Sequence, residues 1–313
     1  MRRWIALPIC SVLLVTACGS TTSTSTTTTG ASLQANIASE VPADIKAKGA
    51  LQVGIDATYA PNEFIDPATG QIRGWDVDLG LALGKVIGVP FAFNNADFSS
   101  IIPDIGTRYD LGISSFTPTA VREKTVDFVT YYQAGESWIV KTGGPQINAP
   151  TDLCGQTVAV ETGTTEEADA YGFLGKTPDG SPIRGDTNHC KSAGKADITV
   201  HSFTKQTDAD ADLLAGHAQI GWADQPVADY QVKQSSNQEQ ISGKPCSVAP
   251  YGIALAKGSA LEKALQDALK YLIDNGYYAQ ILKAWNVADG AIASSGVALN
   301  VNTSGGASCV PSY

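Results

Sequence analysis

The sequence lacks the short motifs that mark the commonest enzyme sites. It contains no GxxxxGK[ST] or GxGxxG loop for nucleotide phosphates, no GxSxG nucleophile turn and no HExxH pair of metal ligands. Histidine is scarce, with three residues in a chain of 313, and no nucleophile–base pair is recognisable. These absences argue against nucleotide-dependent, hydrolytic and zinc-dependent catalysis, and they predict neither a metal nor a cofactor.

Basic residues and long apolar runs are also scarce. The chain has 21 Lys and Arg residues against 31 Asp and Glu residues, a formal net charge of −10. An acidic body argues against nucleic acid or anionic lipid as a partner, because both carry the same charge. Beyond the N-terminal region, no apolar run approaches the roughly 20 residues that a membrane-spanning helix needs.

The N-terminus predicts export and attachment to a lipid. Arg2 and Arg3 precede an apolar run, 4–15, that suits a secretion signal and is too short for a spanning helix. The run ends in Val15-Thr16-Ala17-Cys18, which is similar to a bacterial lipobox with its lipidated cysteine. The alternative is an ordinary signal peptide in which Cys18 is incidental.

A polar tract follows the expected lipidation site. Residues 20–29 are all Ser or Thr, and a tract that cannot bury apolar surface predicts a disordered tether. We therefore divide the N-terminal region into a signal peptide, 1–17, and a lipidated linker, 18–36. The folded protein is expected to lie outside the cytoplasm, held at the cell membrane by its lipid.

Four cysteines remain beyond the N-terminal region, and an even number in an exported protein predicts disulfides. They are Cys154, Cys190, Cys246 and Cys309. Three pairings are possible. We expect Cys154–Cys190 and Cys246–Cys309, because each pair then lies within or beside one segment of the chain. Their spacings match no zinc pattern, and His189 has no second His nearby.

Apolar patterns along the rest of the chain alternate between short strands and longer helices. Strands are expected at 51–55, 90–93, 110–114, 155–160, 198–203, 218–222 and 251–256. Helices are expected at 75–87, 98–105, 259–275 and 277–285, with Ser259 as an N-cap and Gly276 as a C-cap. This alternation predicts an α/β fold with mostly parallel sheets. Ligands of such folds bind beyond the carboxyl ends of the strands.

Four segments that follow predicted strands carry a family resemblance. They are Asp56–Pro61 (DATYAP) with Gly74–Gly80 (GWDVDLG), Ser114–Pro118 (SSFTP) with Arg122–Lys124 and Val126–Phe128, Gly163–Thr165 (GTT), and Gly221–Asp224 (GWAD). Together, in this order between about residues 48 and 286, they resemble the polar amino-acid family (family 3) of bacterial extracellular solute-binding proteins. The resemblance implies the two-lobed type II periplasmic-binding-protein fold, in which each lobe is a mostly parallel sheet flanked by helices and two strands form the hinge.

A free amino acid offers one carboxylate and one ammonium, and the sequence has a candidate for each. Arg122, on a helix opened by Thr117-Pro118, supplies the planar fork that a carboxylate prefers; the alternative is a surface salt bridge to Glu123 or Asp127. Thr164 and Thr165 open a helix whose N–H groups can meet an anion, or they simply cap it. By resemblance Asp224 binds the ammonium, unless it only forms a turn.

The resemblance also implies the rest of the ligand site. The Ser115 carbonyl and the Thr117 hydroxyl help to bind the ammonium, Ser114 lies beside them, and Tyr59 forms an aromatic wall. Asp56 and Glu161 are expected to point into the cleft from opposite lobes, and two carboxylates there favour a cationic side chain.

We accordingly expect arginine, lysine, ornithine or histidine as the ligand, with glutamine as the next candidate and glutamate or aspartate excluded. The alternative is that Asp56 caps a local turn and Glu161 faces solvent. Trp75 stands where the resemblance leads us to expect Phe, and Asn62-Glu63 is a polar insertion in an otherwise apolar wall.

By resemblance, the chain crosses between the lobes near 133–136 and 246–250. Lobe 1 is then expected to hold 37–135 and 248–288, lobe 2 to hold 136–247, and 289–313 to form a C-terminal extension without a family counterpart. A zwitterion that bridges Arg122 and Asp224 would shift the hinge toward its closed state.

The predicted function is capture of a free amino acid for an ABC permease, by a lipid-anchored monomer that is not an enzyme. Two alternatives stay open. One is an amino-acid-sensing lipoprotein that feeds no transporter, and the other is a dehydratase on the same fold, in which Asp224 or Glu161 would act as an acid.

Overall fold

The structure is a computed structural model, and it describes residues 1, 30–302, 305 and 307–310. The expected signal peptide, the lipidated Cys18 and the Ser/Thr tract of 20–29 lie outside the described residues. Across the part of the chain that is described, no helix is both long and apolar enough to cross a membrane.

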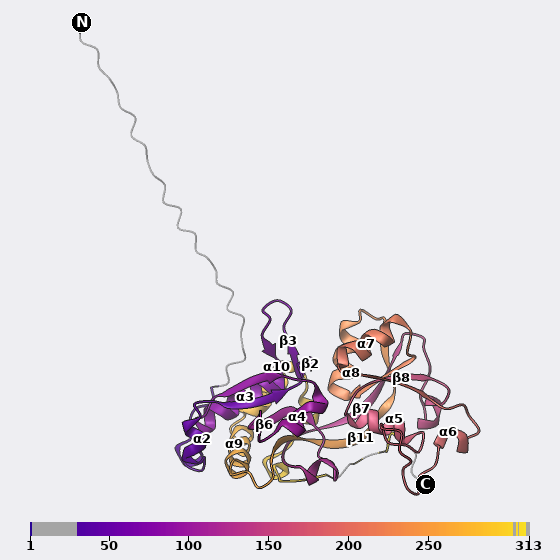
Figure 1. Cartoon of the computed structure of the whole chain (residues 1–313). Coiled ribbons are helices and arrows are strands. Elements are labelled where there is room, and N and C mark those ends of the chain that lie inside the picture. Colours follow the sequence, from indigo (N-terminus) through magenta and orange to yellow (C-terminus); the bar gives the residue numbers. More distant parts are fainter. Residues whose placement is uncertain (2–29, 303–304, 306, 311–313) are drawn as a thin grey trace.

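One eight-stranded sheet runs through both lobes of the molecule, with the strand order β5-β1-β6-β11-β7-β10-β8-β9. Its two longest strands, β7 (Val126–Lys141) and β11 (Glu239–Ala256), pair antiparallel and pass from one lobe to the other (Figure 1). Their register places Gln133 opposite Pro250 and Glu136 opposite Cys246. The two expected crossings therefore lie side by side and form the hinge, as the predicted fold class requires.

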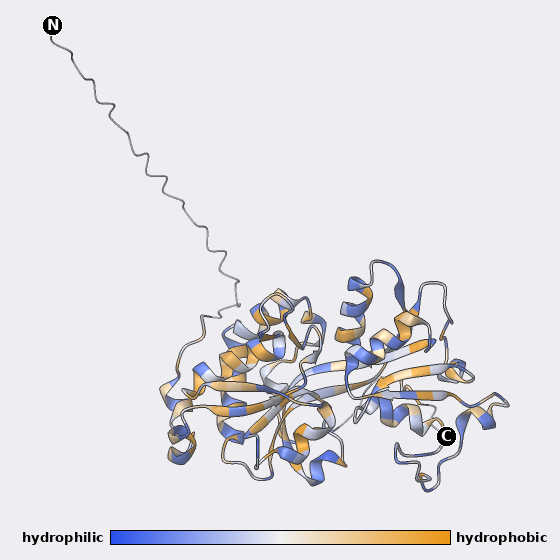
Figure 2. Cartoon of the chain, turned by 45° about the horizontal axis from the view of Figure 1, so that its top comes forward, coloured by the Kyte–Doolittle hydropathy of each residue, from blue (hydrophilic) through white to orange (hydrophobic). Residues whose placement is uncertain are grey.

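Lobe 1 is built on the parallel strands β1 (Leu51–Ile55), β5 (Phe91–Asn95) and β6 (Leu111–Phe116). Its main helices are α3 (Trp75–Ile87), α9 (Glu262–Asp274) and α10 (Tyr277–Trp285), which pack against one another. The side of α9 that faces the core carries Ala264, Leu265, Ala268, Leu269 and Leu272. This spacing of three or four residues is that of an amphipathic helix. Figure 2 shows apolar and polar residues following one another along the ribbons of the chain.

Lobe 2 is built on the parallel strands β8 (Thr157–Glu161), β9 (Thr199–Phe203) and β10 (Ile220–Asp224). Its main helices are α5 (Thr165–Gly172), α7 (Gln206–Ala215) and α8 (Gln225–Gln234). It has a core of its own around Trp138, Phe173 and Trp222, separate from the core of lobe 1 around Trp75 and Tyr251. The two lobes are therefore two packing units joined by the hinge strands.

The remaining described elements are short. They are α1 (Ala35–Ala38), α2 (Ala43–Ala47), β2 (Thr58–Tyr59), β3 (Glu63–Ile65), β4 (Ile72–Arg73), α4 (Phe98–Asp104), α6 (His189–Ser192), and the 3-10 turns η1 (Arg122–Lys124), η2 (Pro150–Leu153), η3 (Ala288–Gly290) and η4 (Ser294–Gly296). Strands β2, β3 and β4 form a small separate sheet.

Three local expectations need correction. Helix α9 begins at Glu262 with Leu261 as its N-cap, so Ser259 does not cap it and instead forms a turn before it. Its C-cap is Asn275, and Gly276 follows in the left-handed conformation that favours glycine. Arg122 lies on one 3-10 turn rather than on a helix opened by Thr117-Pro118.

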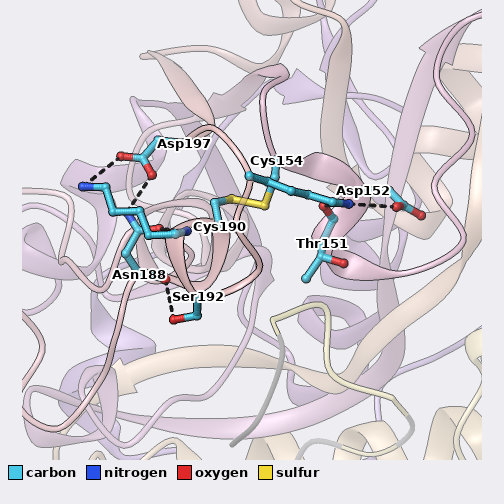
Figure 3. The surroundings of a disulfide bond; sticks show 9 residues. Thr151, Asp152, Cys154, Asn188, Cys190, Ser192 and Asp197 are labelled. Carbon is cyan, nitrogen blue, oxygen red and sulfur yellow. Dashed lines mark hydrogen bonds and ion pairs between the residues drawn. A yellow bond between two sulfur atoms is a disulfide. The ribbon is translucent and has the colours of Figure 1, made fainter.

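Both expected disulfides are present. Cys154–Cys190 joins the end of η2 to α6 inside lobe 2 (Figure 3). Polar contacts lie on both sides of it: Asn188 donates to Asp197 at 2.8 Å beside Cys190, and Lys195 donates to the Thr151 carbonyl at 2.9 Å near Cys154. Cys246–Cys309 joins hinge strand β11 to the C-terminal extension, and both of its cysteines belong to the core of lobe 2.

The C-terminal extension, expected as a separate segment, packs on both lobes. Val297 belongs to the core of lobe 1, and residues 298–300 pair with the outer edge of β7. Gly305 then pairs with Val248 of β11, shortly before the disulfide at Cys309.

Candidate functional site

The carboxyl ends of four strands meet at the cleft between the lobes: β1 and β6 from lobe 1, and β8 and β10 from lobe 2. A cavity of about 10 Å³ lies there, which is room for about one water molecule. Nine of the ten predicted ligand residues line it, together with Phe98 and Glu166, which the sequence did not suggest. The lobes touch around this cavity, so an amino acid can enter only when they part.

A larger cavity of about 260 Å³ lies beside the hinge. It is lined by residues of β7, α8 and η3, among them the charged groups Asp229, Lys233 and Asp289. None of the predicted ligand residues lines it. We place the site in the smaller cavity, because buried charged side chains from both lobes converge there.

Arg122 reaches across the cleft from lobe 1. Its guanidinium donates to the Thr117 carbonyl and to the Gly163 carbonyl of lobe 2, both at 2.8 Å, and its centre lies 5.4 Å from the Phe98 ring. Burial lowers the pKa of Arg122 to about 10, so it stays charged at neutral pH. Among the described residues, Arg122 forms no salt bridge with Glu123 or Asp127: its guanidinium donates to the two carbonyl groups, and Asp127 pairs with Lys257.

The GTT turn forms the lobe 2 wall opposite Arg122. The Thr164 hydroxyl accepts from the Glu167 N–H at 3.1 Å and donates to the Glu161 carbonyl at 2.7 Å. Thr164 is thus the N-cap of α5, one of the two roles considered for it. Thr165 is the first residue of that helix and also lines the cavity.

Asp224 and Tyr59 join the two lobes. The Tyr59 hydroxyl lies 3.1 Å from Asp224 Oδ2 and accepts from the Asp224 N–H at 2.9 Å. Tyr59 was expected only as an aromatic wall, so this polar contact is an addition. Burial, and then the charge of Glu166, raise the pKa of Asp224 well above its usual value.

Glu166 is a functional candidate that sequence reasoning missed. It is the residue after the GTT turn, it is 2 % exposed, and its Oε1 atom is buried without a hydrogen-bond partner among the described residues. Its Oε2 accepts a 3.3 Å bond from Thr165, and its carboxyl group lies beside that of Asp224. Burial raises its pKa, and the charge of Arg122 partly opposes that rise. A buried carboxylate with an unused oxygen is suited to receive a donor from a ligand.

Asp56 and Glu161 approach each other from opposite lobes, as predicted. Both are 1 % exposed, and the Thr58 hydroxyl lies between them, 2.7 Å from Asp56 and 3.5 Å from Glu161. Burial is the largest cause of the raised pKa of each, and for Glu161 the charge of Asp56 is the second.

Each of these two carboxylates also has local partners. Asp56 accepts from the backbone N–H groups of Thr58 and Phe98 at 3.0 and 2.9 Å. It therefore caps a local turn and the start of α4. It is the one predicted ligand residue that does not line the cavity. Glu161 accepts from the Gln206 N–H at 3.1 Å. The alternative that Glu161 faces solvent is wrong, because it is buried.

The matches to known proteins agree with this geometry. Residues 51–288 match the bacterial extracellular solute-binding proteins, family 3, a span that contains every predicted ligand residue.

The chain belongs to this family.

One relative is the arginine-binding protein ArgT of Corynebacterium glutamicum, which is 32% identical over 80% of this chain and 79% of its own. An ancestral arginine-binding protein has solved structures with two ligands. The structure with arginine has a TM-score of 0.66 and 33% identity, and covers 76% of this chain and 98% of its own. The structure with glutamine has a TM-score of 0.64 and 34% identity over the same shares.

In this solute-binding protein, a buried polar layer supports the lobe 1 side of the cleft. The Ser114 hydroxyl accepts from the Asp56 N–H at 2.9 Å and donates to Glu63 at 2.8 Å. Ser115 has a positive φ of 52° and donates from its backbone and hydroxyl to Asp76. Burial raises the pKa of Asp76 to about 6 and that of Glu63 well above its usual value.

The two departures from the family pattern prove to be partners. The indole N–H of Trp75 donates to Asn62 Oδ1 at 2.6 Å, and Asn62 Nδ2 donates to the Ser115 hydroxyl at 2.8 Å. The polar residue in the wall, Asn62, therefore satisfies the indole that replaces the expected Phe, and it also contacts Ser115, a predicted ligand residue.

One set of metal-binding side-chain types comes together in the described residues: Glu136, Asp169 and Cys309, with ligand atoms within 4.8 Å of one another. Cys309 is part of a disulfide, so its sulfur is not available as a thiolate ligand.

Proposed function

We propose that this protein is the amino-acid-binding component of an ABC importer and that it captures a cationic amino acid, arginine first. The observation that carries the proposal is the charge of the cleft. Arg122 is the sole cation among the described residues that line the cavity, and three carboxylates, Glu161, Glu166 and Asp224, line it with Asp56 close behind.

The ligand's backbone groups find partners of opposite charge on opposite lobes. The carboxylate binds Arg122 and the N–H groups at the start of α5. The ammonium binds Asp224, with Ser115 and Thr117 beside it, and Glu166 offers a further acceptor. Because this zwitterion is neutral overall, the carboxyl groups of Asp56 and Glu161 still have no cation beside them after the backbone is bound.

A cationic side chain removes that imbalance. An arginine guanidinium reaches beyond the clamp and donates to both Asp56 and Glu161, while Phe98 and Tyr59 flank its apolar stem. Glutamine donates hydrogen bonds but adds no charge, so it is the weaker candidate, and glutamate is repelled. Solved structures of a related ancestral arginine-binding protein contain arginine or glutamine. Both ligands fit this order of candidates.

Binding is coupled to closure because the partners sit on different lobes. Contacts such as Tyr59–Asp224 and Arg122–Gly163 exist only when the cleft is closed. A ligand that touches both lobes has a higher affinity for the closed state and therefore shifts the hinge toward it. The closed form is then what the permease recognises.

The lobe boundaries follow the division of the two cores. We propose lobe 1 as 37–135 with 248–288 and lobe 2 as 136–247, since the core of lobe 1 ends at Ala134 on β7 and that of lobe 2 begins at Trp138. The extension, 289–313, begins where the family match ends. Since one chain supplies both sides of the cleft, we propose a monomer, which light scattering would test.

The family is extracellular, and we propose that Cys18 carries a lipid that holds the protein at the outer side of the cell membrane. Cys18→Ala is expected to release the protein into the medium or to leave an unprocessed precursor. Fractionation that finds the variant processed and still firmly membrane-bound would contradict lipidation at this residue.

A thermal-shift screen tests the ligand class. The twenty amino acids, ornithine and citrulline are each added to the purified protein. A ligand at 100 times its dissociation constant stabilises the protein by about 2.7 kcal/mol, so arginine is expected to give the largest shift. A largest shift with glutamate would contradict the proposal. Uptake of labelled arginine is then compared between cells that have the protein and cells that lack it. Equal uptake by both would favour the alternative of an amino-acid-sensing lipoprotein that feeds no transporter.

A further inference from the structure

Two carboxyl groups of lobe 2 lie against each other in the cavity. Asp224 ends β10 and Glu166 lies in the first turn of α5, and their carboxyl groups are within hydrogen-bond reach of one another. Both line the cavity, and they are 7 % and 2 % exposed. Because both belong to lobe 2, the pair stays together when the lobes part, whereas Arg122 departs with lobe 1.

The hydrogen bonds around the pair leave one carboxyl oxygen unused. Glu166 Oε2 accepts from Thr165, and Glu166 Oε1 is buried without a partner among the described residues. Asp224 Oδ2 lies 3.1 Å from the Tyr59 hydroxyl. An ionised carboxylate only accepts hydrogen bonds, so two ionised carboxylates in contact cannot bond to each other. One proton between them turns the contact into a strong O–H···O⁻ hydrogen bond.

The charges around Glu166 also oppose ionisation of both carboxyl groups. Arg122 is the one cation among the described titratable groups that face Glu166, and its guanidinium donates to two carbonyl groups rather than to either carboxyl group. The other titratable groups that face it are Tyr59 on β2, Glu136 on β7, Glu161 on β8, Asp169 on α5 and Asp224 on β10. Burial, followed by the charge of Glu166, raises the pKa of Asp169 to about 7 and that of Asp224 well above its usual value. Several buried acids around one cation therefore favour a retained proton.

We propose that Glu166 and Asp224 share one proton in the ligand-free protein and that the ammonium of the ligand displaces it, so that capture of an amino acid releases a proton. The inference rests on the proposed function, which places the ammonium at Asp224. An ammonium has three N–H donors, enough to bond to Asp224 and to the unused Glu166 oxygen at once. The carboxyl O–H bond breaks, its proton passes to water in the open cleft, and the ammonium supplies the positive charge in its place.

This role differs from that of Asp56 and Glu161, which face the side chain of the ligand. The proton and the ammonium compete for the same two carboxyl groups, so a lower pH weakens binding at this end of the cleft as well. Arginine and glutamine carry the same ammonium, and both are expected to release this proton. Glu166 therefore sets a pH dependence that all amino-acid ligands share.

Calorimetry in buffers with different heats of ionisation counts the released protons. Arginine is titrated into the protein at pH 7.5 in phosphate and in Tris. Glu166→Gln keeps the shape of the side chain and removes one ionisable group, so it is expected to release about half a proton to one proton fewer than the wild type. Asp208→Asn removes an exposed carboxyl group of lobe 2 and is the matched control. Glu166→Gln that binds arginine and releases as many protons as the wild type would overturn the shared proton.

A second variant keeps the test decisive where Glu166→Gln does not bind arginine. Glu161→Gln removes a carboxyl group at the other end of the cleft and keeps the Glu166–Asp224 pair, so its binding of arginine should still release a proton. Binding without proton release would contradict the proposal. Circular dichroism confirms that each variant is folded at the temperature used.

Infrared difference spectroscopy gives a check that does not depend on the ligand. The spectrum of the ligand-free wild type minus that of Glu166→Gln should contain the C=O band of a protonated carboxylic acid, and the absence of this band would overturn the shared proton. If the band is present but the wild type binds no amino acid, the proposed function is wrong and the shared proton stands. If the wild type binds arginine and the band is absent, the proposed function stands without the shared proton.

Discussion

The two ends of the cleft differ in how their charges are balanced. At one end, the cation Arg122 from lobe 1 lies with the carboxyl groups of Asp224 and Glu166 from lobe 2, so both signs of charge are present, as a zwitterion requires. At the other end, Asp56 and Glu161 face each other across the lobes without a cation between them, and the Thr58 hydroxyl lies near both. We propose that the balanced end recognises the backbone groups common to amino acids and that the unbalanced end selects the side chain.

Removing the cation of the balanced end should have the largest effect. Arg122→Ala leaves the ligand carboxylate without its partner in a closed cleft, and truncating one side of such a pair costs about 2–5 kcal/mol. We expect arginine binding to weaken at least 30-fold by calorimetry, with the fold intact. Lys124→Ala, which removes an exposed cation two residues away, is the control and should bind normally. A loss below threefold for Arg122→Ala would remove this residue from the site.

Neutralising one carboxylate of the unbalanced end should change selectivity more than overall binding. Glu161→Gln keeps the shape and removes one charge, so arginine is expected to bind about tenfold more weakly, in line with the loss of one charged hydrogen bond. Glutamine should bind as well as before or better. Asp208→Asn, an exposed change in the first turn of α7, is the control. Equal losses for arginine and glutamine would mean that Glu161 does not read the side chain.

Acidification should affect arginine affinity and stability with opposite signs. Burial raises the pKa values of Asp56 and Glu161, so protons begin to neutralise them as the pH falls, and arginine is expected to bind about threefold to tenfold more weakly at pH 5 than at pH 8.

The same burial makes the folded protein bind protons more tightly than the unfolded chain. The pKa values of about 6 for Asp76 and about 7 for Asp169 lie above the usual 3.8. The free energy of unfolding without ligand should therefore rise as the pH falls from about 7 to about 4, and decline as the pH rises through these values. Thermal melting without ligand measures this stability. A melting temperature that falls between pH 7 and pH 4, in step with the arginine affinity, would contradict the prediction.

Behind the balanced end, the expected effect is on stability and not on the choice of ligand. Trp75→Phe leaves Asn62 Oδ1 without its donor in a buried position, which costs about 1–3 kcal/mol of stability. Asn62→Phe with Trp75→Phe should recover part of that loss, because both polar partners are then gone. A double-mutant cycle on melting temperature measures the coupling, and additive effects would contradict the partnership.

The sequence predicted the elements that carry a clear apolar period and the residues that follow strands. Helices α3 and α10 and strand β1 have the expected bounds, and nine of ten predicted ligand residues line the cavity. Strand β7 was missed, because a strand buried in both lobes shows no alternation.

What the sequence could not supply depends on contacts between distant segments. Glu166 received no role from the sequence, and only the closed cleft shows that its carboxyl group is buried near Arg122. Phe98 was placed on a short helix, yet nothing local indicated that its ring would lie under a guanidinium. The course of the extension over the hinge likewise depends on one disulfide and a few backbone bonds.

The most direct test of the central claim compares arginine with citrulline, which has nearly the same shape but no side-chain charge. Calorimetry on the wild-type protein at pH 7.5 gives both dissociation constants. If Asp56 and Glu161 select a cationic side chain, arginine binds at least ten times more tightly than citrulline, and Glu161→Gln narrows that ratio. Citrulline that binds as tightly as arginine would contradict the account.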